Sequence, residues 1–366
     1  MTDAGDVTHL DDGPPMDADG QALVASLPEL LAEGAAPAAL VTVVRAQGSA
    51  PRGPGARMLV RDGGLLAGTI GGGHLERRAM HEACGLLTEN IDFPASLRSW
   101  ALGPALAQCC GGRVAVRLEP LTAPAAWALA AKLRAAEASS APFVTGVGDH
   151  QLTERPTAPW TVVIFGAGHV TRALAQVLQV QPWRVVVVDA RPEWAHASAF
   201  PPTTEVHAAP PVAVLAAWGW LAARATTDQA APPALAAEDD VAAAVTGPAP
   251  DPSRTLALIM THDHELDRQL AWALLRRPDV GERPLAHVGV IGSRTKITTL
   301  RRRLTGQGVS EAALARLVAP IGLRQPDASG VERPIGGKRP GEIATSVAAE
   351  LMVRIATLSH SESTAT

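Results

Sequence analysis

The sequence predicts an α/β protein, with an N-terminal α+β domain followed by a domain built on a doubly wound parallel sheet. Short strand-like segments separated by Gly and Pro turns occupy the first third of the chain. From residue 161 onward, continuous runs of Val, Ile and Leu alternate with amphipathic segments, as in a buried parallel sheet covered by helices. A length of 366 residues is sufficient for two such domains.

The first domain is predicted over residues 21–120, after an acidic and polar tail at 1–20 that we expect to be disordered. Its predicted elements are a helix over 21–34 ended by Gly34, a strand over 39–46, strands over 56–61 and 65–70 joined by the hairpin signal Asp62-Gly63-Gly64, a helix following Gly71–Gly73, and a strand over 113–121. Residues 121–158 combine an Ala-rich helix with polar, Pro-containing segments and are interpreted as a linker.

The second domain is predicted over residues 159–352, with a C-terminal tail at 353–366. Strand–helix segments are predicted over 161–179, 256–275 and 287–304, and a further strand over 183–194. An Ala/Pro-rich stretch at 209–254 interrupts this alternation and is interpreted as an insertion.

Charge and composition exclude several classes of protein. A formal net charge of −4 provides no basic field for nucleic acid or an anionic membrane surface. We find no signal peptide and no apolar run of the roughly 20 residues that a spanning helix needs. Three cysteines, two of them adjacent, form no disulfide framework, which favours a cytoplasmic location.

The segment VVIFGAGHV is typical of the phosphate-binding turn of a Rossmann-like domain. Gly166 and Gly168 allow a tight turn and a close backbone approach, and Asp189 ends the next strand, where it can bind a ribose. Thr171 stands where a third Gly or Ala is usual and is expected to crowd the helix against the strand. A Rossmann-shaped domain with an empty turn is the alternative.

Two further segments follow predicted strand ends. In IGSRTK, Ser293 can cap the next helix, while Arg294 and Lys296 place cations at a helix N-terminus, which favours contact with a phosphate. In THDHELD (261–267), the crowded His and carboxylate side chains permit metal ligation, ligand contact or helix capping. The candidate residues in this second segment are His262, Asp263 and His264.

The N-terminal domain has its own candidate segments. Gly71, Gly72 and Gly73 precede a helix and form either an anion-binding nest or a tight turn, with His74 and Glu76 as polar ligand contacts or surface residues. Arg52 and Arg57 lie nearby in sequence.

The thiols are concentrated in one segment. Cys109 and Cys110 precede a Gly pair, so turn residues could expose two soft nucleophiles or metal ligands, although a buried pair is also compatible. Cys84, within a helical pattern, is predicted to be a core thiol.

Nine segments, in order, resemble the XdhC/CoxI family of xanthine dehydrogenase accessory proteins. They are GSAPRGPGARMLV, GTIGGGHLE, GPALAQCCGGRV, VVIFGAGHVTRAL, VVVVDARPEW, MTHDHELD, VGVIGSRTK, LVAPIGL and PGEIATSVAAEL. The resemblance covers about residues 21–352, apart from the predicted linker and insertion.

The resemblance implies a chaperone rather than an enzyme. Its cargo would be the molybdenum cofactor (molybdopterin), protected during sulfuration by a cysteine desulfurase and inserted into xanthine dehydrogenase or a related molybdenum hydroxylase. It also implies a homodimer, and a thiol of Cys109 or Cys110 in contact with molybdenum. The implied cofactor-binding residues are Cys109, Cys110, Gly71, Gly72, Gly73, His74, Glu76, Gly166, Gly168, His169, Asp189, Arg191, His262, Asp263, His264, Ser293 and Arg294.

The chain departs from the family pattern at Thr171 and in the segment RQPDASGVERPI (324–335), where the family runs on more directly. Two other functions stay open. One is an NAD(P)-dependent oxidoreductase, with His169, His262 or His264 as acid or base. The other is a sulfurtransferase acting through a Cys persulfide.

Overall fold

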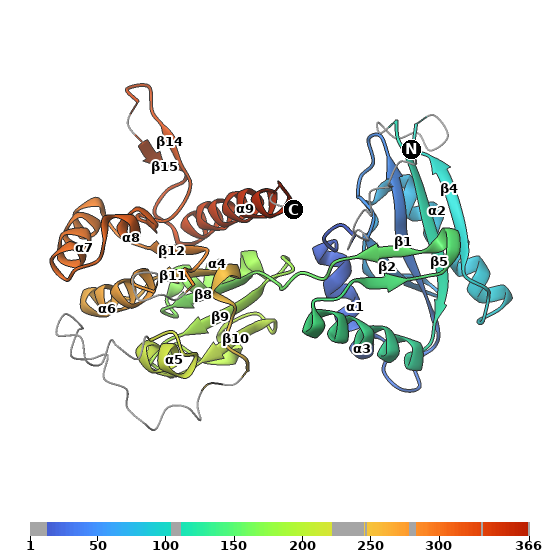
Figure 1. Ribbon diagram of the computed structural model, residues 1–366, viewed down its shortest axis with the longest axis horizontal. Coiled ribbons are helices and arrows are strands. Elements are labelled where there is room, and N and C mark those ends of the chain that lie inside the picture. Colours follow the sequence, from blue (N-terminus) through green and yellow to red (C-terminus); the bar gives the residue numbers. More distant parts are fainter. Residues whose placement is uncertain are drawn as a thin grey trace, which may run out of the picture. The chain divides into compact units, whose positions relative to one another are not determined.

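Two main sheets organise the chain, and each belongs to its own unit (Figure 1). The computed structural model describes residues 13–103, 111–221, 245, 247–277, 283–330 and 332–364. The units comprise Met1–Ala158 and Pro159–Thr366. The predicted fold class is confirmed, because the first unit has an antiparallel sheet with helices and the second a parallel sheet covered by helices.

The first unit contains a five-stranded antiparallel sheet in the order β3-β2-β1-β5-β4. Its elements are α1 (Ala18–Leu30), β1 (Ala38–Gln47), β2 (Arg57–Arg61), β3 (Gly64–Gly68), α2 (Gly73–Glu89), β4 (Ser96–Ala101), β5 (Arg113–Leu121), α3 (Ala123–Ser139), β6 (Phe143–Thr145), η1 (Gly148–His150) and β7 (Leu152–Glu154). Ala39 and Val41 of β1 pack in the core that α2 covers, whereas Ala38 and Leu40 pack in the core that α1 and α3 cover. Both faces of β1 are therefore buried, which explains its continuous apolar run.

Residues 121–158 belong to the first unit and do not form the predicted linker. Helix α3 buries Leu133 in the same core as Leu27 of α1, and strands β6 and β7 form an antiparallel pair. This segment is therefore part of the packed domain.

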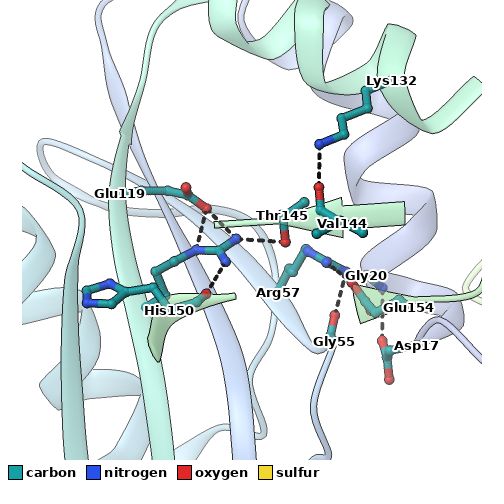
Figure 2. A network of polar contacts seen from close by, with 11 residues as sticks. Asp17, Gly20, Gly55, Arg57, Glu119, Lys132, Val144, Thr145, His150 and Glu154 are labelled. Atoms are coloured by element: carbon teal, nitrogen blue, oxygen red, sulfur yellow. Dashed lines mark hydrogen bonds and ion pairs between the residues drawn. The ribbon is translucent and has the colours of Figure 1, made fainter. Parts of the chain in front are cut away.

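One buried ion pair, to Glu154 of β7, and a hydrogen bond to Thr145 of β6 hold the β6–β7 pair against the main sheet (Figure 2). Arg57 of β2 forms an ion pair with Glu154 of β7, and neither side chain is more than 2% exposed. Arg57 also donates to the carbonyl of Gly55 (2.9 Å), and Arg117 of β5 donates to the carbonyl of His150 (2.7 Å). Glu154, one of the polar residues that make 121–158 resemble a linker in sequence, is thus the counter-ion of a buried arginine.

The second unit contains a six-stranded parallel sheet in the order β10-β9-β8-β11-β12-β13. Its elements are β8 (Thr161–Phe165), α4 (His169–Leu178), β9 (Arg184–Val188), η2 (Ala197–Ala199), β10 (Thr204–His207), α5 (Pro211–Ala217), η5 (Pro252–Arg254), β11 (Thr255–Ile259), α6 (His264–Leu275), β12 (His287–Val290), α7 (Arg294–Gly306), α8 (Glu311–Ala315), β13 (Leu317–Val318), β14 (Arg324–Pro326), β15 (Glu332–Pro334) and α9 (Pro340–Thr364). Counted from β8, the order is 3-2-1-4-5-6, which is the Rossmann arrangement.

Helices cover both faces of this parallel sheet. Residues of α4 and α9 pack with Val162 and Ile164 of β8, whereas α5, α6, α7 and α8 pack in the core that contains Val163 and Phe165. Strands β9 and β10 are added on one side of β8, and β11, β12 and β13 on the other, so the order in which strands are added reverses between β8 and β11. Ligands of open α/β sheets bind outside the carboxyl ends of the strands at this switch point.

Several predicted boundaries change. Helix α1 begins within the predicted tail, because the Asp17 carboxylate caps it by accepting from Gly20 N–H (2.9 Å). Helix α9 runs through the predicted tail at 353–366 as far as Thr364, and Ile355 packs against the core. The predicted insertion contains α5 and η5, whereas residues 222–244 and 246 lie outside the described residues.

Candidate functional site

The Gly turn after β8 has the predicted strand–turn–helix geometry. Gly166 has φ +110°, and a Cβ added there would lie 2.5 Å from the Met260 carbonyl oxygen at the end of β11. Only glycine accommodates both the backbone conformation and this close approach. Gly168 is the N-cap of α4, and His169 is exposed on its first turn.

Thr171 is accommodated by a hydrogen bond and does not hold the helix away from the strand. Its side chain is 1% exposed, and its hydroxyl donates to the Gly166 carbonyl (2.6 Å). The departure from the usual small residue therefore locks the turn to α4.

Asp189 is buried beneath the Gly turn with its carboxylate fully engaged. It accepts from Ala167 N–H (2.8 Å), from Arg191 N–H (3.0 Å) and from both arms of the Arg191 guanidinium (2.9 and 2.6 Å). Burial alone would raise the pKa of Asp189, but the hydrogen bonds from Arg191 and Ala167 outweigh it and hold the pKa below its ordinary value. The predicted ribose acceptor and one N–H of the turn are thus already paired with each other.

An aromatic side chain that the sequence analysis did not select lies beside this turn. The Trp194 ring centroid lies 4.9 Å from the Arg172 guanidinium carbon, 5.2 Å from that of Arg191 and 5.3 Å from the His169 ring centroid. The signal available in the sequence was the three-residue spacing between Arg191 and Trp194, which a tight turn brings together. Cations against an aromatic face form a platform suited to a planar anionic ligand.

The segment after β11 is mainly structural. Asp263 caps α6 by accepting from Glu265 N–H (2.7 Å) and Leu266 N–H (3.3 Å), so the capping interpretation holds for this residue. His262 and His264 are exposed. In the described ranges, His, Cys, Asp and Glu side chains nowhere form a group of three that could hold a metal.

The IGSRTK segment lies between two cavities. Ser293 caps α7 by accepting from Lys296 N–H (3.2 Å), and the Lys296 ammonium pairs with the buried Asp267. His264 and Lys296 line a cavity of about 260 Å³ between α6 and α7. Arg294 lines a second cavity, of about 540 Å³, beyond the ends of β12 and β13.

In the first unit, the Gly71–Gly73 turn contains an anion of the protein itself. One oxygen of the Glu76 carboxylate accepts from the Thr69 hydroxyl (2.5 Å), Ile70 N–H (3.0 Å) and Gly72 N–H (3.0 Å). These N–H groups are therefore paired within the chain rather than open to an external anion. His74, two residues before Glu76, is exposed.

The structure brings three Gly-rich segments of the first unit to one end of its sheet. A side chain at Gly112 would collide with the Ser49 carbonyl, and one at Gly71 would collide with Pro51. The GSAPRGPG turn therefore contacts both the GTIGGG turn and the end of the CCGG segment. Gly112 N–H also donates to the Ser49 carbonyl (3.1 Å), and its own carbonyl accepts from Leu102 N–H (2.8 Å).

The cysteines separate into two groups. Cys109 and Cys110 lie outside the described residues, on the connection between β4 and β5. Cys84 packs against the core on α2, half-buried, as predicted for a core thiol.

The arginines near the Gly-rich turns are engaged elsewhere in the first unit. Arg52 pairs with Asp17 and Asp19 (both 2.7 Å), and Arg57 with Glu154. Both therefore stabilise the fold.

Comparison with known proteins identifies the family. The XdhC Rossmann domain model matches residues 162–351, and the model of the XdhC and CoxI family matches residues 31–92. The uncharacterized protein YqeB of Escherichia coli K12 is 29% identical over 323 residues, which are 88% of this chain and 44% of YqeB. The chain thus spans less than half the length of that relative.

A Bacillus halodurans protein whose crystal structure is described as a xanthine dehydrogenase shares the fold. Its TM-score is 0.62 at 20% identity, over 91% of this chain and 96% of that chain. Since the XdhC Rossmann domain match alone covers more than half of the present sequence, the chain belongs to the XdhC family.

Proposed function

We propose that the protein is an accessory factor that binds the molybdenum cofactor as cargo, protects it during sulfuration and aids its insertion into xanthine dehydrogenase or a related molybdenum hydroxylase. The observation that carries this proposal is the XdhC family match to both units. A cysteine desulfurase, the recipient molybdoenzyme and a second copy of the chain are the proposed partners, in the cytoplasm. None of the described helices is long and apolar enough to cross a membrane.

The Rossmann unit supports cargo binding better than nicotinamide chemistry. Asp189, the residue that would bind an adenosine ribose, accepts four hydrogen bonds from Ala167 and Arg191. A dinucleotide would have to break these bonds before the carboxylate could accept from a ribose hydroxyl. A phosphorylated pterin makes no such demand on Asp189, because its anionic group needs cations and N–H donors.

The first unit would contribute the thiols. In the proposal, Cys109 or Cys110 contacts molybdenum, because a thiolate is a soft donor that suits this metal better than a carboxylate does. The contacts of Gly112 with Ser49 and of Gly71 with Pro51 gather Gly-rich backbone at the end of the sheet from which the CCGG segment leaves. Binding must protect the metal end and yet be reversed by contact with the recipient enzyme.

The test is metal and pterin analysis of the full chain purified beside a source of the cofactor, together with calorimetry against NAD(H). The proposal expects molybdenum and pterin in near-stoichiometric amounts and weak or undetectable NAD(H) binding. Tight NAD(H) binding without pterin uptake would assign the Rossmann unit to an oxidoreductase. Mass spectrometry that finds one added sulfur on Cys109 or Cys110 after incubation with a desulfurase would indicate a sulfurtransferase.

A further inference from the structure

We propose that the cavity of about 540 Å³ beyond the ends of β12 and β13 binds the phosphate group of a small phosphorylated molecule. Its volume lies in the range of roughly 300–1,000 Å³ typical of sites for small ligands. Its identification as the anchor for the phosphate end of the cargo rests on the proposed function. The binding of a phosphate monoester is argued from the cavity alone.

The lining of this cavity is cationic and partly apolar. Its charged residues are Arg294, Arg324, Arg333 and Lys338, and no Asp or Glu belongs to the described lining. Its apolar residues are Ile291, Pro320, Ile321, Pro334, Ile335 and Ile343. Cations beside an apolar wall are suited to an amphipathic ligand with an anionic group at one end and a planar or hydrocarbon body at the other.

Two of these cations converge without a carboxylate between them. Arg294 and Arg324 both donate an Nη2 hydrogen bond to the carbonyl oxygen of Glu332, at 2.8 and 2.9 Å. In the described part of the chain, the ion pairs include none to Arg294, Arg324 or Lys338, whereas Arg333 pairs with Asp327 (2.8 Å). Guanidinium groups that meet at a neutral carbonyl repel each other, and a bound phosphate would remove this repulsion.

The backbone around the cavity also favours an anion. Gly292 and Gly337 line it, so a ligand can approach the main chain closely. Ser293 begins α7, a helix of 13 residues, so the positive end of its dipole faces the same region. Glu342, beside Gly337, is engaged at the start of α9, where it accepts from Arg339 N–H (3.2 Å).

Two of the four cationic side chains in the described lining come from one hairpin. Arg324 and Arg333 lie on the β14–β15 hairpin, which extends away from the Rossmann sheet (Figure 1). Ile335 N–H donates to the Leu323 carbonyl (2.9 Å) at the base of this hairpin. The hairpin therefore supplies two of the cations in the described lining, and the other two are Arg294 and Lys338.

The Gly turn after β8 is the competing anchor, and its polar groups are less available. There the Ala167 N–H already donates to Asp189, which places a carboxylate next to the turn. A phosphate at this turn would approach that carboxylate directly, whereas the described lining of the 540 Å³ cavity has four cationic side chains and no Asp or Glu.

The experiment measures calorimetric binding of two probes, inorganic phosphate and guanosine monophosphate, in a buffer without phosphate. Arg324→Gln and Lys338→Gln should each weaken binding about tenfold or more, because each removes a charged donor. Arg302→Gln, which removes the same charge from an exposed position on α7, should not change it. Among the described residues, Lys338 has no hydrogen-bond or ion-pair partner, so Lys338→Gln should leave the hairpin folded even if Arg324→Gln disturbs it.

Two outcomes overturn the inference. One is wild-type protein that binds neither probe at millimolar concentration. The other is loss of binding in Gly168→Asp with full binding in Arg324→Gln and Lys338→Gln, which would place the phosphate at the Gly turn. A Cβ at Gly168 meets no atom within 4 Å, so this variant should fold.

Pterin retention separates this inference from the proposed function. If the wild type and both cavity variants retain equal amounts of pterin, the cavity is not the anchor of the cargo, and the proposed function is unaffected. If phosphate binding depends on Arg324 and Lys338 but the protein takes up no pterin, the cavity is a phosphate site and the proposed function is wrong.

Discussion

The carboxylate of Asp189 accepts a 2.8 Å hydrogen bond from the backbone N–H of Ala167, which joins the end of β9 to the Gly turn after β8. This bond uses two groups that a dinucleotide would need, one for the ribose and one for the pyrophosphate. It therefore ties the Gly turn to the end of β9 and leaves both groups paired within the chain.

Replacing Asp189 by Asn should lower the free energy of unfolding by about 2 kcal/mol, because a charged acceptor of several hydrogen bonds becomes neutral. The folded pKa lies below the ordinary value of 3.8, so this contribution is fully present above that pH and is lost as the pH falls through the folded pKa. Urea unfolding from pH 7 downward should show the gap between wild type and variant closing in acid. Asp92→Asn, at an exposed site, is the control. A gap that is independent of pH would refute the charged role of Asp189.

Replacing Glu154 by Gln should destabilise the first unit by about 3–5 kcal/mol, because Arg57 is left buried without a counter-ion. Calorimetric melting of the full chain measures this loss. Glu82→Gln breaks the exposed pairs with Arg78 and Arg98 and should cost less than about 1 kcal/mol. The double variant Arg57→Met/Glu154→Leu should recover most of the stability. If the two single variants melt alike, the buried pair does not hold β7 in place.

Replacing His287 by Gln tests a buried histidine. Burial, together with the nearby Arg354 charge, lowers the pKa of His287 from 6.5 to about 4. The folded protein therefore favours the neutral form of this histidine. Its contribution is fully present above pH 6.5 and is lost as the pH falls toward 4. The difference in unfolding free energy between wild type and variant should therefore shrink by roughly 3 kcal/mol over this range.

Glu350, whose carboxylate lies 3.5 Å from the His287 ring, has the opposite effect on the pH dependence of stability. Glu350 is present in both the wild type and the His287 variant. Burial raises its pKa, so its contribution is present below pH 4.5 and is lost as the pH rises through its folded pKa. His81→Gln, on the exposed face of α2, should show no such pH dependence. An equal pH dependence in the His81 and His287 variants would contradict the buried neutral form.

Replacing Cys109 and Cys110 together by Ser should weaken binding of the metal-bearing cofactor and leave binding of metal-free pterin nearly unchanged. The physical reason is that Ser offers a hard, largely protonated donor in place of a soft thiolate. Binding of both cofactor forms and thermal melts of the variants are the measurements, with Cys84→Ser as the control. Equal loss for both forms would assign the pair to packing.

The elements that the sequence predicted best are those of the Rossmann unit. Strands such as β8 are buried on both faces, so local hydrophobicity alone identifies them. Strand β4, with the mixed segment SLRSWA, and the pair β6–β7 were missed, because their stability comes from pairing and from buried arginines such as Arg57. The thiol segment was selected from the sequence, and its role stays a prediction.

The sequence by itself determined the main strand–helix segments of the Rossmann unit and the glycines at the turns, because periodicity and turn chemistry are properties of neighbouring residues. Only the tertiary structure decided which polar groups are free to bind. Asp189 and Glu76 resemble ligand-binding carboxylates in sequence, yet each accepts hydrogen bonds from an adjacent Gly-rich turn. Conversely, Arg294 and Arg324 lie thirty residues apart in the sequence, and only the fold brings both to the Glu332 carbonyl, one from the start of α7 and the other from the β14–β15 hairpin.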